Sequence, residues 1–178
     1  AESDGVVVEM GYISHEDLHS YRVLGGKCQG HVDMKWCPGV DFSAGSLGMG
    51  LSFGLGCAVA ARLDKSERRT FVMIGDGEIQ EGSVWEAAMA AAHHEVGNLK
   101  VILDRNRIQN DDFCEAQMRM FDIPAKWRAF GWEVKEIDGH NMEELMSGLD
   151  FLEATNDKPA ILIAHTIKGA GVSFMENN

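Results

Sequence analysis

The chain has 178 residues, with 16 Lys and Arg against 28 Asp and Glu, so its formal net charge is −12. Nucleic acids and anionic membrane surfaces attract proteins largely through a surplus of basic side chains, which this sequence lacks. With 45% hydrophobic and 25% charged residues, the composition is that of an ordinary globular protein, and the length predicts one domain with a sizeable core.

The amino-terminal third combines a short helix pattern with a long glycine-rich segment. Ser14 followed by Asp17 matches a capping box and predicts a helix over about His15–Arg22. The next twenty residues have little periodicity, which predicts a long structured loop of the kind that often carries function. Over Ser46–Leu63, small residues recur at nearly every fourth position, which predicts a buried helix packed closely against its neighbours.

The rest of the chain alternates apolar runs with helix-forming segments. The predicted strands cover Thr70–Ile74, Leu99–Leu103, Trp132–Ile137 and Pro159–His165. The predicted helices cover Val84–Ala92, a segment capped by Asp122 that stops at Gly131, and a segment from the capping box of Asn141 and Glu144 to about Thr155. This alternation predicts an α/β fold, a doubly wound parallel sheet with helices on both faces, in which the first strand is buried on both sides.

The cysteine pattern favours a reducing compartment. Cys28, Cys37, Cys57 and Cys114 form no CxxC pair. Cys57 lies within an apolar run, where we expect a reduced and buried thiol. We therefore expect the protein to be cytoplasmic.

Polar and glycine-rich clusters follow the predicted strands. In parallel sheets the carboxyl ends of the strands meet at one edge, where ligands bind. Asp76 offers a carboxylate and Asn106 an amide oxygen, both ligands that Mg²⁺ prefers. Gly75 and Gly77 leave room for backbone N–H groups to approach a phosphate, and we expect the helix after Gly77 to point its positive end at that anion. The pattern predicts a magnesium diphosphate site, although Gly-Asp-Gly alone also fits a plain strand-to-helix turn.

The combination of motifs is more specific than any one of them. It comprises Gly75-Asp76-Gly77-Glu78-Ile79-Gln80-Glu81-Gly82, Asp104-Arg105-Asn106-Arg107-Ile108-Gln109, an upstream segment over 45–52 and a downstream Thr166-Ile167-Lys168-Gly169. Together they resemble the thiamine diphosphate signature of the transketolase family. The resemblance covers essentially the whole chain, and it is greatest to the amino-terminal subunit of split transketolases, in which two genes encode the two halves.

The resemblance implies a role for each matching residue around the diphosphate. Asp76 and Asn106 would be side-chain ligands of Mg²⁺, and the carbonyl of Ile108 would be a third protein ligand. Gly77 would give a backbone N–H to the diphosphate, beside Gly75.

It also implies roles farther along the cofactor. Gly45 and Leu47 would contact the aminopyrimidine, and His31 would hydrogen-bond the ketose substrate. Glu81 would lie at the interface between active sites. Simpler interpretations remain open, because the family's usual proline after this histidine is Val32 here, and an acidic residue such as Glu81 can merely stabilise the start of a helix.

The implied function is transfer of a two-carbon ketol unit from a ketose to an aldose, as in the pentose phosphate reactions of carbohydrate metabolism. Residues 1–178 would form a single diphosphate-binding domain that lacks the family's amino-terminal helices and its carboxyl-terminal continuation. The glutamate that activates the cofactor would come from a carboxyl-terminal, pyrimidine-binding transketolase subunit, in a complex with two copies of each half. A 1-deoxyxylulose-5-phosphate synthase-like enzyme and a noncatalytic subunit that keeps the fold are the alternatives.

Overall fold

The computed structural model describes residues 2–177 and divides into two compact units, residues 1–47 and 48–178. Each unit is described by itself. Within the described residues, no helix combines the length and the apolar character needed to cross a membrane. That residues 1–178 form one diphosphate-binding domain stays a prediction.

The first unit consists of two short helices and a long loop. Helix α1 covers Glu2–Glu9 and was not predicted, whereas α2, at His15–Leu18, begins where the sequence indicates. Its capping box is present, because Asp17 N donates to Ser14 Oγ at 3.2 Å and Ser14 N donates to the Asp17 carboxylate at 2.9 Å. The helix ends after about one turn, before the predicted end. The long loop that follows is confirmed.

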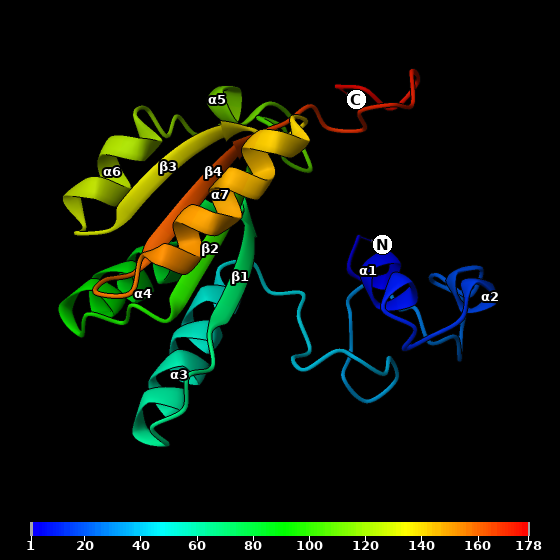
Figure 1. Cartoon of the computed structure of the whole chain (residues 1–178). Helices are drawn as coiled ribbons and strands as arrows, with labels where there is room; N and C mark the ends of the chain where they lie inside the picture. Colours follow the sequence, from blue (N-terminus) through cyan, green and yellow to red (C-terminus); the bar gives the residue numbers. More distant parts are fainter. Residues whose placement is uncertain (1, 178) are drawn as a thin grey trace. The chain divides into compact units, whose positions relative to one another are not determined.

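The second unit contains a four-stranded parallel sheet in the order β1-β2-β4-β3 (Figure 1). Its strands are β1 (Thr70–Gly75), β2 (Leu99–Arg105), β3 (Glu133–Asp138) and β4 (Ala160–His165). All four lie where the sequence predicts strands. Connections through helices, as predicted, make every pairing parallel.

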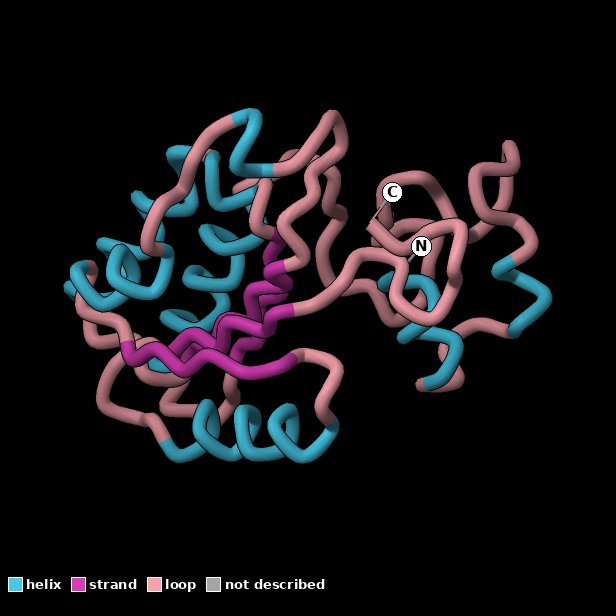
Figure 2. The backbone as a smooth tube through the Cα atoms, turned by 90° about the horizontal axis from the view of Figure 1, so that it is seen from above, coloured by secondary structure: helices cyan, strands magenta, loops and turns pink. Residues whose placement is uncertain are grey.

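Helices cover both faces of this sheet (Figure 2), which confirms the doubly wound α/β fold. The helices are α3 (Met49–Leu63), the 3₁₀ turn η1 (Glu78–Gln80), α4 (Gly82–His93), α5 (Cys114–Gln117), α6 (Ile123–Ala129) and α7 (Met142–Ala154). Side chains of α3, α4 and α6 pack with Val72, Val101 and Ile161 in the main core. Helix α7 packs on the other face, where it contacts a smaller core that includes Leu162 and Ala164.

Coverage of the two faces is unequal, and the prediction that the first strand is buried on both sides is wrong. Val72 and Ile74 of β1 are buried, but Phe71 is 47% exposed and Met73 is 65% exposed. Strand β1 is at the edge of the sheet, and α7 contacts β3 and β4 instead. Strand β4 is the one whose side chains are buried on both faces.

Helix α3 is also less buried than predicted. One stripe, which includes Leu51, Gly54 and Ala58, is buried, whereas Phe53 is 43% exposed. Cys57 lies on the exposed side, so the expectation of a buried thiol at this position is wrong. Periodicity identified the helix, but it could not show that only one stripe contacts the sheet.

The predicted caps of the later helices are largely confirmed. Asp122 accepts a hydrogen bond from Ala125 N at 2.8 Å at the start of α6. Asn141 accepts from the backbone of the first turn of α7, but the backbone bond of Glu144 comes from Asp138 N at 2.8 Å. Glu144 thus ties the end of β3 to α7 and does not complete the reciprocal capping box.

The packing of α3 on β1 predicts opposite effects for two glycines in this helix. A Cβ at Gly54 would lie 2.3 Å from Val72 Cγ2, whereas a Cβ at Gly56 would meet nothing within 4 Å. Gly54→Ala should therefore lower the free energy of unfolding by about 1–3 kcal/mol through overpacking. Gly56→Ala, the matched control, should raise it by up to about 1 kcal/mol through helix propensity. Urea unfolding followed by circular dichroism measures both, and equal effects at the two positions would contradict this packing.

Candidate functional site

Strand register brings the chemically interesting residues to one edge of the sheet. Gly75 at the end of β1 pairs with Asp104 of β2. Farther across the sheet, Arg105 pairs with His165 of β4, which in turn pairs with Asp138 of β3. The loops that follow all four strands therefore start from the same edge, as the sequence predicts.

Asp76 is the residue around which this edge is organised. Its side chain is 1% exposed. Its Oδ2 accepts hydrogen bonds from the Arg107 backbone N and from Arg105 Nη1, the latter at 2.8 Å. Its Oδ1 lies 3.2 Å from Cys114 Sγ, which donates to it. A buried carboxylate needs such donors and a counter-charge, and this one has both.

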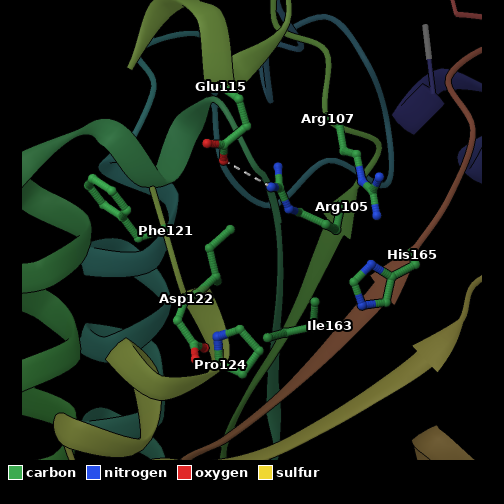
Figure 3. Close-up of a pocket in the computed structure, with 9 residues that line it drawn as sticks. Arg105, Arg107, Glu115, Phe121, Asp122, Pro124, Ile163 and His165 are labelled. Atoms are coloured by element: carbon green, nitrogen blue, oxygen red, sulfur yellow. Dashed lines mark hydrogen bonds and ion pairs between the residues drawn. The ribbon is translucent and has the colours of Figure 1, made fainter. Parts of the chain in front are cut away.

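Arg105 supplies that counter-charge. Its side chain is 11% exposed, and it forms a second ion pair, between Nη2 and Glu115 Oε1, at 3.3 Å. Figure 3 shows the guanidinium turned toward Glu115, beside a cavity that continues to Pro124 and His165. The cavity has a volume of about 330 Å³.

Cys114 is a neutral donor to Asp76. Burial raises the pKa of its thiol to about 12, and the hydrogen bond to the Asp76 carboxylate and the charge of that carboxylate act in the same direction. The thiol therefore stays protonated throughout the physiological pH range, which keeps the hydrogen bond in place.

Asn106 is held by a second set of contacts. Its Nδ2 donates to Asp104 Oδ2 at 2.8 Å, and its Oδ1 accepts from Ile108 N at 3.0 Å. Asp104 is itself bonded to the hydroxyl of Thr166, which follows β4. Because Asp104 occupies the amide nitrogen, the amide oxygen of Asn106 is the atom left to face a cation.

Gly77 forms a close approach that a larger residue could not make. A Cβ at this position would lie 2.8 Å from Gln109 Cβ. The nearby Gln109 Oε1 is buried and has no hydrogen-bond partner among the described residues. Glu78 accepts from Gly48 N at 2.9 Å and from Gly75 N at 3.2 Å, so it ties the start of α3 to the end of β1.

The segment after Gly77 differs from the expectation of a helix that points directly at an anion. Only the 3₁₀ turn η1 follows at once, and α4 begins at Gly82 with Glu81 as its N-cap residue. The Glu81 side chain makes no capping hydrogen bond. A glycine-rich turn before a helix produced the expectation, but Glu78 folds back onto backbone N–H groups and shortens that first turn.

The remaining predicted residues belong to the first unit. His31 is exposed, and its ring lies against Gly45, where a Cβ would be 2.8 Å from His31 Cγ. Gly45 has φ 151°, which favours glycine. Leu47 is 59% exposed. His31 and Gly45 are therefore in contact, and Asp76, Gly77, Asn106 and Ile108 form a separate group within the second unit.

The second group fits a hard cation that also binds a phosphate group. Within residues 2–177, no three His, Cys, Asp or Glu side chains cluster as a metal site. A cation here would instead combine one carboxylate, at Asp76, with the amide oxygen of Asn106 and a backbone carbonyl, the hard oxygen ligands that suit Mg²⁺ when phosphate completes the set. A carboxylate has about four acceptor positions, and the contacts of Asp76 leave one of them available. The residues present therefore fit a magnesium diphosphate.

Sequence reasoning found Asp76, Asn106 and Gly77 but missed the residues that hold them. Arg105, Asp104 and Cys114 were not predicted to take part. Arg105 and Asp104 lie within the recognised motif, so a charged residue at a strand end was the available signal. Nothing in the sequence pointed to Cys114, which follows the loop after β2.

Known proteins resemble this chain over most of its length. It is 43% identical over 166 residues to one subunit of the apulose-4-phosphate transketolase of Phocaeicola vulgatus, and the match covers 93% of this chain and 59% of that protein. It is 38% identical over 166 residues to the "6-deoxy-6-sulfo-D-fructose transketolase subunit SqwG" of Clostridium sp. (strain MSTE9), with 93% of this chain and 60% of that protein covered. The chain thus spans about 60% of the length of these relatives.

Solved structures agree with the sequence relatives. Transketolase from Leishmania mexicana superimposes with a TM-score of 0.83 at 30% identity, over 89% of this chain and 25% of that one. The family model described as "Transketolase, thiamine diphosphate binding domain" matches residues 7–178. The chain therefore belongs to the transketolase family, as a member of its thiamine diphosphate-binding domain.

Proposed function

We propose that this chain is the half of a two-subunit transketolase that holds Mg²⁺ and thiamine diphosphate. The observation that carries the proposal is the buried Asp76 carboxylate, bonded across the ends of β1 and β2 to the segment that also presents Asn106. Asp76, Asn106 and the carbonyl of Ile108 would hold the cation. The backbone at Gly75 and Gly77 would receive the diphosphate.

The proposed reaction transfers a two-carbon ketol unit from a ketose to an aldose. When bound, thiamine diphosphate supplies the nucleophilic carbon that this transfer requires. His31 would hydrogen-bond the ketose, and its contact with Gly45 supports a shared position for the two. Gly45 and Leu47 would contact the aminopyrimidine. The names of the two relatives point to sugar derivatives as substrates, and the sugar used here is left to experiment.

The proposal includes a partner that supplies the other half of the cofactor site. Relatives named as single subunits of their transketolases support a second, carboxyl-terminal subunit. The exposed side of α3, including Phe53, is an apolar surface suited to such a partner, and Glu81 at the start of α4 would lie near it. A cytoplasmic location and a role in pentose phosphate metabolism stay predictions.

The first test removes the proposed metal ligand. Asp76→Ala should weaken Mg²⁺-dependent thiamine diphosphate binding by more than about 100-fold, since even residues that only support ligands cost 10–100-fold. Titration calorimetry of the assembled protein measures this. Asp150→Ala, which removes an exposed carboxylate from α7, is the matched control and should bind normally. Undiminished binding by Asp76→Ala would exclude Asp76 as a ligand.

A second test separates the substrate contact from the cofactor contacts. His31→Ala should lower kcat/KM for the ketose by about 10–100-fold, the value of one lost hydrogen bond to a polar substrate, and leave cofactor affinity nearly unchanged. Steady-state kinetics and calorimetry give the two values. A collapse of cofactor binding would instead assign His31 to the cofactor.

A third test concerns the assembly. The chain and its partner half should sediment as a complex with two copies of each, because an obligate interface commonly buries about 2,000–5,000 Å². Phe53→Glu, on the exposed side of α3, should weaken this complex. Full ketol-transfer activity in an isolated monomer of this chain would contradict the proposal.

A further inference from the structure

The Asp76 carboxylate is already neutralised before any cation arrives. Arg105 Nη1 lies 2.8 Å from Asp76 Oδ2, and the two side chains are 11% and 1% exposed. At such burial an ion pair is poorly screened, so a second positive charge beside Asp76 meets repulsion from the guanidinium. Arg105 therefore competes with a cation for the same carboxylate.

Arg105 also has a second partner within reach. Its Nη2 lies 3.3 Å from Glu115 Oε1, and Glu115 is about half exposed, with a side-chain exposure of 47%. Both residues line the cavity of about 330 Å³ drawn in Figure 3. The guanidinium can therefore leave Asp76 while keeping a carboxylate partner and without entering packed protein.

A diphosphate changes this balance. Mg²⁺ alone adds two positive charges next to Arg105, whereas Mg²⁺ with the diphosphate adds little net charge or a negative one. The repulsion from Arg105 thus opposes the bare cation much more than the cation and diphosphate together.

We propose that Arg105 is a movable counter-charge that makes Mg²⁺ binding conditional on the diphosphate, by exchanging Asp76 for Glu115 when both arrive. This inference rests on the proposed function, since it needs the cation and the diphosphate to bind at Asp76. It assigns Arg105 as a positioning residue and Glu115 as the partner that receives it.

The test is titration of the assembled protein with Mn²⁺, a paramagnetic substitute for Mg²⁺, with and without thiamine diphosphate. Free Mn²⁺ is measured by electron paramagnetic resonance, so the readout does not depend on activity. Arg105→Gln should bind Mn²⁺ alone at least about 5-fold more tightly than the wild type, the lower end of typical coupling between sites. Its gain in Mn²⁺ affinity on adding thiamine diphosphate should shrink correspondingly.

Two further variants make the test specific. Arg107→Gln removes the neighbouring positive charge but keeps the backbone N–H that Asp76 accepts, so it should change Mn²⁺ affinity less than about twofold. Glu115→Gln should weaken Mn²⁺ binding in the wild-type background and have no further effect in Arg105→Gln, because Glu115 acts through Arg105. Far-ultraviolet circular dichroism confirms that each variant is folded.

The outcomes separate this inference from the proposed function. If the wild type binds no Mn²⁺ even with thiamine diphosphate, the proposed function fails and this inference with it. If the wild type binds Mn²⁺ with the cofactor but Arg105→Gln leaves the affinity for Mn²⁺ alone unchanged or weaker, only the role of Arg105 is overturned. An equal effect of Arg107→Gln would assign the change to general charge and likewise overturn it.

Discussion

The buried carboxylate of Asp76 is the constraint on which the site depends. It follows β1 directly, and the parallel pairing of Gly75 with Asp104 brings it beside the first residues after β2. Hydrogen bonds from Arg105 and from the backbone of Arg107 then fix both loops relative to each other. Since an unpaired charge at this depth would be costly, the same contacts that stabilise the apoprotein also determine what can bind there.

Much of the second unit could be predicted from the sequence because its local signals agree with its packing. Apolar runs located every strand, and Asp122 located the start of α6. The errors concern burial, which depends on what lies opposite. The continuous apolar run of β1 is typical of a strand covered on both faces, yet Phe71 and Met73 are exposed at the edge of this sheet. The exposed side of α3, with Cys57, was missed for the same reason.

The site was predictable to the extent that it depends on strand ends. Asp76 and Asn106 follow neighbouring strands, and a parallel sheet must bring them to one edge. Their supporting contacts could not be predicted, because they depend on side-chain directions in three dimensions. Cys114 reaches Asp76 across 38 positions of sequence, and Thr166 reaches Asp104 across 62. A hydrophobic pattern carries no information about such pairs.

The central claim is that the ends of β1 and β2 form one site for a cation and a diphosphate. The most direct measurement is anomalous diffraction, at the manganese absorption edge, from crystals of the assembled protein with Mn²⁺ and thiamine diphosphate. The account predicts one anomalous peak in contact with the side-chain oxygens of Asp76 and Asn106 and with the diphosphate. A peak bound by other residues, or a diphosphate bound away from this edge of the sheet, would contradict it.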